Sequence, residues 1–281
     1  MLNAVPVDPA VEDRVRELEI PFNKWGIDPY GIEQQELGRF FSALQFFYRN
    51  YFDVHVHGIE NLPARGRAMI VGNHSGGVAI DATMIISASF FEREPPRLAQ
   101  GMVDKFLGKI PGASQVASRV GQFAGLPEHA ARFLEDERLL MVFPEGARGT
   151  AKLAKDAHTL VHFGSGFIRL ALETRTPIVP VAFLGGGKAI PTVMNLSRLG
   201  KLIGVPYLPV TPYGLPVPLP ARFDLLFGEP MRFEGTGNED DSAIRDMVES
   251  VRGRIGDLIG RGEQLRDGAI DESALSFGGT R

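Results

Sequence analysis

Two short polar segments, each placed at the end of an apolar run, carry the residues of this chain that can do chemistry. The first is NHSGGVAID, residues 73–81, which follows the apolar residues 67–72. The second is FPEGAR, residues 143–148, which closes the apolar run 138–143. The first segment offers an imidazole and a carboxylate, and the second places an arginine beside a glycine. This combination suits the activation of a hydroxyl group and the binding of an anionic group.

His74 is the candidate general base of the first segment. Neutral imidazole is the usual base near pH 7, and it works better when a carboxylate holds its other ring nitrogen. Asp81 can supply that carboxylate if the turn at Gly76 and Gly77 folds the intervening residues back. A lone histidine at a strand end is more often structural, so this prediction depends on both segments together.

Arg148 is the candidate anion ligand of the second segment. Its planar guanidinium suits a phosphate or a carboxylate. Glu145 is expected to orient that arginine or to bind a hydroxyl, with Gly146 forming the turn between them. The alternative for an isolated Glu-Gly-x-Arg segment is a salt-bridged turn with no functional role.

Composition limits the class of protein. The 281 residues are 44% hydrophobic and 23% charged, as in ordinary folded proteins. The net charge of −4 argues against nucleic-acid binding, and the absence of cysteine excludes disulfides and a cysteine nucleophile. No apolar stretch reaches the roughly 18–20 residues that span a bilayer. We expect a cytoplasmic protein without a membrane span, for which attachment to a membrane surface stays open.

Strands and helices are predicted to alternate along most of the chain, which indicates an α/β domain. The predicted organisation is an N-terminal arm (1–30), a single α/β domain (31–262) and a flexible tail (263–281). The expected strands lie at 53–58, 67–72, 97–103, 138–143, 178–184 and 223–227, and the expected helices at 34–52, 81–91, 128–137, 164–174 and 240–262.

Two regions are candidates for contact with lipid. Residues 34–52 predict a helix with an unusually aromatic face, which either packs on the core or lies at a membrane interface. Residues 185–220 predict an irregular, proline-rich apolar segment. That segment either caps an acyl-chain groove, dips into a membrane surface or simply connects two elements.

The chain resembles the glycerolipid acyltransferase superfamily, of the lysophosphatidic acid acyltransferase type (1-acylglycerol-3-phosphate acyltransferase). Residues 73–81 resemble the first motif of the family, and residues 143–148 match the third closely. Residues 176–181, which include Pro180, resemble the fourth motif, a strand near the acceptor. The similarity covers roughly residues 50–230. It implies a mixed, mostly parallel sheet flanked by helices, preceded here by the aromatic N-terminal helix.

The chain departs from the family pattern in two places. The family places four residues between the histidine and the aspartate, whereas six lie between His74 and Asp81. If the glycines do not absorb the additional pair, Asp104 is the alternative partner. The second motif is only loosely recognisable in residues 112–121, where Arg119 is the best match.

The resemblance implies an acyl transfer without a covalent acyl-enzyme. His74, oriented by Asp81, would take the proton of an acceptor hydroxyl that attacks an acyl thioester, either acyl-CoA or acyl-carrier protein. The lipid acceptor at the membrane surface would be a lysophospholipid. The expected substrate-binding residues are the phosphate ligands, the backbone that meets the oxyanion and the strand proline: Glu145, Gly146, Arg148, Arg119, Ser75, Gly76, Gly77 and Pro180.

No metal and no cofactor beyond the thioester are expected. His158 and His162 have the helical spacing of a metal pair, but the residues between them lack a catalytic glutamate. Three rival functions remain: transfer to a neutral alcohol such as diacylglycerol or a long-chain alcohol, hydrolysis of the thioester, and lipid binding without catalysis.

Overall fold

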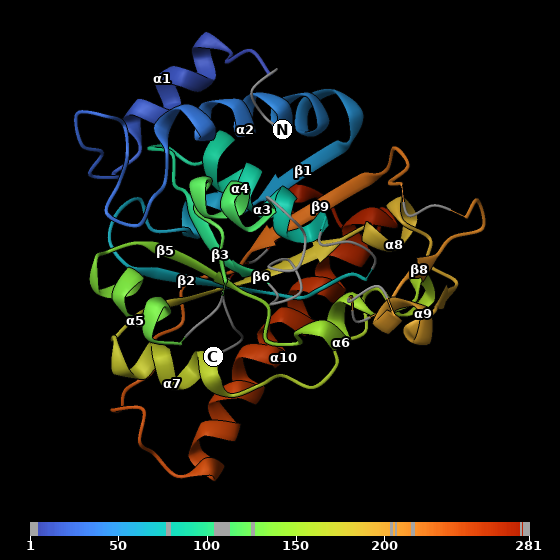
Figure 1. The fold of residues 1–281 in the computed structure, drawn as a ribbon. Helices are drawn as coiled ribbons and strands as arrows, with labels where there is room; N and C mark the ends of the chain where they lie inside the picture. The colour runs from blue at the N-terminus through green and yellow to red at the C-terminus, as the bar shows by residue number, and fades with distance from the viewer. Residues whose placement is uncertain are drawn as a thin grey trace.

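A seven-stranded sheet runs through the centre of the molecule, with helices on both of its faces (Figure 1). The structure, a computed structural model, describes residues 5–76, 80–103, 113–124, 127–202, 205, 207–214, 217–275 and 277. The strand order is β1-β9-β6-β2-β5-β3-β4, in which only the β6–β9 pair is antiparallel. The predicted fold class, a mixed and mostly parallel sheet flanked by helices, is confirmed.

The strands are β1 Asp53–His57, β2 Ala68–Gly72, β3 Ala99–Val103, β4 Phe123–Ala124, β5 Leu139–Val142, β6 Ile178–Leu184 and β9 Arg222–Phe227, and a second, two-stranded sheet pairs β7 Met194–Asn195 with β8 Pro209–Val210. The helices are α1 Pro9–Glu17, α2 Gln34–Phe46, α3 Ile80–Phe91, α4 Ala113–Arg119, α5 Pro127–Glu135, α6 Ala147–Thr150, α7 Gly166–Glu173, α8 Gly186–Ala189, α9 Ser197–Leu202 and α10 Asp241–Arg266. A π-helical turn, η2 Phe47–Tyr51, extends α2.

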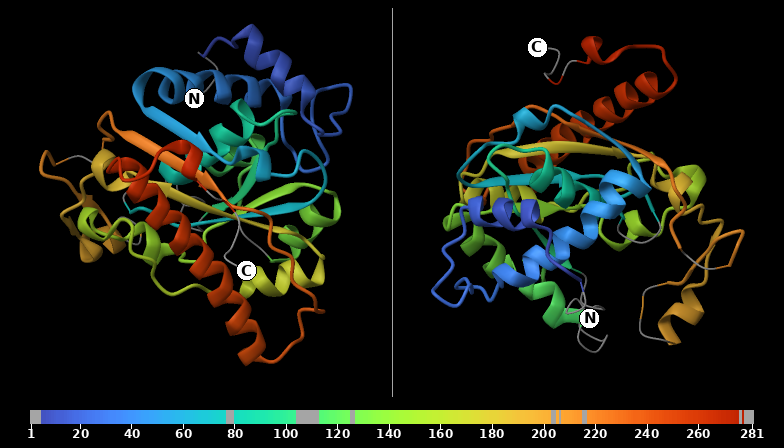
Figure 2. Two further views of the ribbon diagram at one scale, coloured as in Figure 1. Left: turned by 180° about the vertical axis from the view of Figure 1, so that it is seen from behind. Right: turned by 90° about the horizontal axis from the view of Figure 1, so that it is seen from above.

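The central strands are apolar on both faces because helices cover both faces. Strands buried on two sides read as continuous apolar runs, as β2 does with five buried residues. Alternate side chains point to opposite faces, so Ala68 and Ile70 belong to one core cluster and Met69 and Val71 to the other. The first cluster packs under α1, α2 and α3, and the second under α5, α7 and α10. Figure 2 shows α2 and α10 on opposite sides of the sheet.

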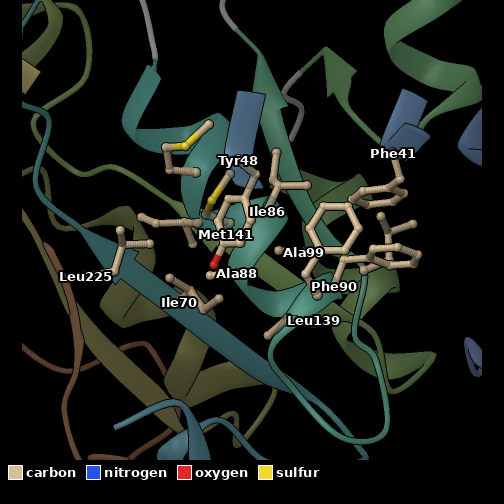
Figure 3. Close-up of a cluster of buried hydrophobic side chains, with 14 of the residues drawn as sticks. Phe41, Tyr48, Ile70, Ile86, Ala88, Phe90, Ala99, Leu139, Met141 and Leu225 are labelled. Atoms are coloured by element: carbon tan, nitrogen blue, oxygen red, sulfur yellow. The ribbon is translucent and has the colours of Figure 1, made fainter. Parts of the chain in front are cut away.

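Aromatic side chains fill the core on the α2 face (Figure 3). Phe41 of α2 stacks on Phe90 of α3 with ring centroids 3.7 Å apart and planes 10° apart. Each fully buried phenylalanine stabilises the fold by about 2–3 kcal/mol relative to an exposed one. The aromatic helix is therefore mainly a core element, as the first of the two interpretations predicts. Phe46 and Phe47 at its end are nevertheless 58% and 42% exposed.

The structure differs from the sequence-based expectation at both ends of the chain. Residues 9–17 form α1, whose Val11 and Val15 are buried against the core, where a loosely packed arm was expected. Asp8 caps this helix by accepting from the backbone N–H groups of Ala10 and Val11. At the other end α10 continues to Arg266, beyond the expected boundary at 262.

The segment between β6 and β9 is more ordered than an irregular loop. It contains α8, followed by β7 and β8, which pair as a small antiparallel hairpin with α9 between them. Short elements of two to six residues leave no extended periodic pattern, which is why the sequence indicated only a loop. Helix α4, helix α6 and strand β4 were not predicted, for the same reason.

The topology brings three strand ends together. Strands β6, β2 and β5 are adjacent and parallel, so their carboxyl ends lie at one edge of the sheet. In open α/β sheets this edge is where ligands bind. The two polar segments of the sequence follow β2 and β5, and a triple glycine follows β6. In the part of the chain that the structure describes, no helix combines the length and apolar character needed to cross a membrane.

Candidate active site

The imidazole of His74 and the carboxylate of Asp81 are in direct contact. His74 lies two residues beyond the end of β2, and Asp81 lies in the first turn of α3. The distance from His74 Nδ1 to Asp81 Oδ2 is 3.1 Å. The same carboxylate oxygen accepts the backbone N–H of Ser75 at 2.9 Å, and Oδ1 accepts that of Ala82 at 2.7 Å. The pairing predicted in spite of the six intervening residues is therefore present.

Asp81 remains ionised in this environment. Burial by itself raises the pKa of its carboxyl group, but the charge and hydrogen bond of His74 act in the opposite direction. Together with the N–H groups of Ser75 and Ala82 they hold the pKa of Asp81 below its ordinary value. A fully buried carboxylate is thus available to stabilise a protonated imidazole.

Two contacts hold the ring of His74, one with Asp81 and one with Phe143, and they leave the second ring nitrogen for chemistry. It stacks on Phe143 with centroids 4.1 Å apart and planes 11° apart. When Nδ1–H donates to Asp81, Nε2 carries the free lone pair. His74 retains 8% exposure. An imidazole held in place through Nδ1, with the lone pair of Nε2 left for a proton, is the arrangement that a general base requires.

Glu145 holds the backbone of His74 and is not at the surface. Its Oε1 accepts the N–H of His74 at 3.1 Å, and its Oε2 accepts that of Val161 at 3.2 Å. Glu145 is only 3% exposed. We expected it to orient Arg148 or bind a hydroxyl, but the ion pair that it forms among the described residues is with Lys152. Its observed role is to lock the β5 end against the β2 end.

Lys152 is a site residue that the sequence analysis missed. Its ammonium lies 2.6 Å from Glu145 Oε2 and donates to the carbonyl oxygen of His74 at 2.6 Å. Burial lowers the pKa of Lys152, while the charge of Glu145 raises it, and the net change is a decrease. A lysine in a turn is ordinarily exposed. The sequence therefore carried no signal for this contact.

Asn73 links β2 to β6 immediately before the histidine. Its side chain accepts the backbone N–H of Phe183 at 2.8 Å and donates to the carbonyl of the same residue at 3.1 Å. These two bonds continue the ladder between the strands beyond the last backbone pair. The asparagine of the first motif thus sets the direction in which the chain leaves the sheet toward His74.

Three glycines allow the loops after the strands to touch. A Cβ on Gly149 would lie 2.7 Å from the Cβ atoms of both His74 and Glu145. A Cβ on Gly186, after β6, would collide with the hydroxyl of Ser75. Gly76 has φ of +85°, and a Cβ there would lie 2.5 Å from the carbonyl oxygen of Lys152. Any larger side chain at these positions would push the loops apart.

Gly149→Ala is expected to lower kcat about 10²-fold, because a displacement of roughly 1 Å at a catalytic group costs that much. The alanine methyl group must move His74 or Glu145, since neither contact is with a flexible side-chain end. The matched control is Gly260→Ala in α10, where a Cβ meets no atom within 4 Å. Steady-state kinetics should show normal turnover for the control, and equal turnover in both variants would contradict the proposed packing.

The remaining predicted residues divide between the site edge and positions elsewhere. Gly146 has φ of +56° with open space around it, and Arg148 is exposed on α6. Both therefore face solvent beside the site. Arg119 lies at the end of α4, where its Nε is 3.1 Å from Glu33 Oε1. Pro180 is buried within the sheet, level with Val71, and its carbonyl accepts the N–H of residue 228.

Other expectations are changed or fall outside the described residues. The N–H of Ser75 is used by Asp81, so it is not free to bind an oxyanion. Gly77 and Asp104 lie outside the described residues, as do residues 104–112, which include the start of the second-motif region. Residues 158–162 are not helical, so the i, i+4 spacing of that histidine pair does not apply.

Comparisons with known proteins agree with this arrangement. A family model described as Acyltransferase matches residues 53–184. An uncharacterized protein of Mycobacterium leprae is 34% identical over 223 residues, which are 75% of this chain and 60% of that protein. An uncharacterized protein of Mycobacterium tuberculosis is 32% identical over 247 residues, covering 82% of this chain and 68% of that protein. The chain thus spans 60–68% of the length of these relatives.

Two further proteins carry descriptive names. The human "DGAT1/2-independent enzyme synthesizing storage lipids" is 29% identical over 214 residues, 75% of this chain and 62% of that enzyme. The crystal structure of the 1-acyl-sn-glycerophosphate acyltransferase PlsC from Thermotoga maritima has a TM-score of 0.55 and 21% identity, covering 82% of this chain and 79% of that one. That likeness shows a shared fold. The matched family model, the relatives and the strand-end motifs together show that the chain belongs to the glycerolipid acyltransferase superfamily.

Proposed function

We propose that the protein transfers a fatty acyl group from a thioester to the hydroxyl of a lysophospholipid such as 1-acylglycerol-3-phosphate. The thioester would be acyl-CoA or an acyl-carrier protein, and no resident cofactor takes part. The observation that carries the proposal is the His74–Asp81 pair at the carboxyl edge of the sheet, 3.1 Å apart and next to the exposed Arg148.

The proposed reaction is a single displacement through a tetrahedral intermediate. Nε2 of His74 removes the proton of the acceptor hydroxyl, and the hydroxyl oxygen attacks the carbonyl carbon of the thioester. The carbon–sulfur bond then breaks, and the departing sulfur takes the proton back from His74. Asp81 stabilises the imidazolium that exists between these two proton transfers, and its lowered pKa keeps it charged throughout. The positive charge of the imidazolium is thereby paired with a carboxylate inside the protein.

Arg148 is proposed to bind the phosphate of the acceptor. It is exposed on α6, the short helix that starts two residues after Glu145. A Cβ on Gly146, at the start of this helix, would meet no atom within 4 Å, so there is open space at this position. Glu145 is engaged with Lys152 and the backbone of His74, so the guanidinium of Arg148 is not neutralised by that neighbouring carboxylate. A guanidinium at the edge of the site without an ion-pair partner among the described residues is suited to a phosphate.

Arg148→Ala is expected to raise the KM for a phosphate-bearing acceptor about 10–100-fold, with little effect on kcat. This range corresponds to the loss of a hydrogen bond to a charged group, about 1.5–3 kcal/mol. The matched control is Arg245→Ala, an exposed arginine on α10. An unchanged KM for the charged acceptor in Arg148→Ala would remove Arg148 from the phosphate site.

A neutral alcohol such as diacylglycerol or a long-chain alcohol is the second candidate acceptor. Two observations favour it: Arg119, the other expected phosphate ligand, is paired with Glu33, and the human relative is named for storage-lipid synthesis. One acyl thioester supplied with charged and neutral acceptors separates the two candidates. Release of free fatty acid without acceptor would instead indicate hydrolysis. Binding of lipid without any turnover would indicate a non-catalytic lipid-binding protein.

A further inference from the structure

The segment between β6 and β9 gathers most of the exposed apolar side chains of the described chain. We name the described residues between 185 and 221 the apolar lobe; they are residues 185–202, 205, 207–214 and 217–221. Eleven large apolar side chains are exposed among the described residues, and seven of them belong to this lobe. Exposed apolar side chains that cluster mark a contact surface more often than scattered ones do. The seven are Val193 (55% exposed), Met194 (50%), Leu199 (44%), Leu202 (81%), Tyr213 (42%), Val217 (57%) and Leu219 (42%).

The lobe is built as a folded unit, so these side chains are presented by a defined backbone. Met194 pairs with Val210 across the β7–β8 ladder. The N–H of Gly200 donates to the carbonyl of Leu196 inside the helical turn, at 2.9 Å. A Cβ on Gly200 would lie 2.5 Å from the Cα of Tyr207, so the helix packs directly on the returning chain. The exposure is therefore a property of the fold and not of a loose end.

The charge of the lobe is one-sided. Residues 185–221 contain Lys188, Arg198 and Lys201 but no aspartate or glutamate, although the whole chain has 34 acidic residues. Lys188 and Arg198 are exposed. The combination of exposed apolar and basic side chains fits a surface that is apolar inside and negatively charged outside.

The lobe is hydrogen-bonded to the segment that follows α6, beside the candidate site, and to the end of the aromatic helix (residues 34–52). Asn195 donates to the carbonyl of Ala151, at the end of α6, at 2.6 Å. The N–H of Ala154 donates to the carbonyl of Thr192 at 2.9 Å. On the opposite side the hydroxyl of Tyr51 donates to the carbonyl of Pro218 at 2.8 Å. Figure 1 shows α8, α9 and β8 at the same end of the sheet as α6.

We propose that the apolar lobe docks the protein onto an anionic lipid bilayer. The apolar side chains of α9 and of the flanking turns enter the boundary between headgroups and acyl chains. Lys188 and Arg198 bind the headgroup phosphates. The lobe would thus hold the mouth of the site at the surface where a lipid acceptor resides. The benefit of this placement rests on the proposed function, because it brings the site to a lipid acceptor. Binding of the protein to vesicles can be measured without any turnover.

The apolar lobe is better suited to contact with a bilayer than to contact with a second copy of the chain. In a two-fold contact the same patch meets itself, which brings like charges of the two lobes together. No acidic side chain within the lobe is available to compensate for this repulsion. An anionic bilayer supplies both the apolar environment and the opposite charge.

The test measures partitioning onto vesicles of phosphatidylcholine with and without about one third phosphatidylglycerol. We expect the wild type to bind the anionic vesicles more tightly, with binding that weakens as salt is added. The double variant Leu199→Ser and Leu202→Ser should bind at least about tenfold less tightly, since binding scales with the apolar area inserted. Arg198→Ala should lose about fivefold on the anionic vesicles only, as expected for one basic residue near the surface.

The matched control is the double variant Trp25→Ser and Ile27→Ser, which removes exposed apolar side chains outside the lobe. It should bind vesicles like the wild type. Turnover of a detergent-dispersed acceptor should be unchanged in the lobe variant, so loss of docking is distinguished from loss of catalysis. Equal vesicle binding by wild type and lobe variant would overturn the proposal. So would sedimentation that shows a wild-type dimer dissociated by the lobe variant.

Discussion

His74→Asn lowers kcat by about 10²–10⁴-fold, the contribution expected of a positioned general base. Asparagine can donate to Asp81 from the place of Nδ1, so the buried carboxylate keeps a partner at this position. What disappears is Nε2, the nitrogen that would take the proton of the acceptor. His74→Ala should lower kcat by at least the same factor, and the variant should still fold. Steady-state kinetics with a saturating thioester measures both effects.

The control for His74 is a second histidine–aspartate pair at the surface. His55 Nε2 lies 2.9 Å from Asp53 Oδ1, and the two side chains are 36% and 67% exposed. His55→Asn should leave kcat unchanged. Far-UV circular dichroism and thermal melting should show that all the variants are folded, with a loss of about 1–2 kcal/mol in His74→Asn for the removed stacking on Phe143. Normal turnover by a folded His74→Asn variant would contradict the assignment of His74 as the general base.

Asp81→Asn is expected to lower kcat by a comparable factor, about 10²–10⁴-fold, without removing any group that touches substrate. The amide cannot stabilise an imidazolium as a carboxylate does, and its NH₂ group can face Nδ1 and favour the wrong tautomer of His74. The acceptor KM should change little, because Asp81 lies behind the histidine and is fully buried. Asp53→Asn, the same change in the surface pair, is the matched control.

The stability of Asp81→Asn should depend on pH in a defined direction. The folded-state pKa of Asp81 is depressed below that of an unfolded aspartate, about 3.9. Asp81 therefore contributes stability above about pH 4, and this contribution is lost as the pH falls through the folded-state pKa. Urea denaturation should show a gap between wild type and Asp81→Asn at neutral pH that narrows below pH 4. A gap that widens on acidification would contradict the ionised, hydrogen-bonded carboxylate.

The effects of the His74 and Asp81 substitutions on kcat should not be additive. If His74 and Asp81 act as a unit, the double variant will be little slower than His74→Asn alone. Fully multiplicative losses would mean that Asp81 acts independently of the histidine, for example through the backbone of Ser75, whose N–H it accepts.

The sequence was sufficient for features that depend on neighbouring residues. The buried strands β2, β5 and β6 could be predicted because strands covered on both faces are continuous apolar runs. The segments that follow β2 and β5 could be assigned to a family by residue type alone. The helix that begins near Asp81 could be predicted from its run of apolar residues. Each of these signals lies within a window of about ten residues.

The sequence was insufficient where short elements or distant contacts decide the outcome. Helix α1 was missed because nine residues leave little periodic signal, and its burial comes from packing against α2. Arg119 was assigned to the site by motif position, but α4 places it beside Glu33. Glu145 was expected to orient Arg148 or to bind a hydroxyl, whereas the packing of β5 against β2 places it against the backbone of His74 and the ammonium of Lys152.

By itself, then, the sequence determined the chemistry available to this protein: a histidine, an aspartate and an arginine at strand ends, within an α/β acyltransferase fold. Only the tertiary structure decided which of these groups meet. His74 and Asp81 are seven positions apart in the sequence, and His74 and Lys152 are 78 positions apart. Gly186 reaches Ser75 from the end of a third strand. These contacts exist because β6, β2 and β5 are hydrogen-bonded side by side, and that pairing is a property of the whole sheet.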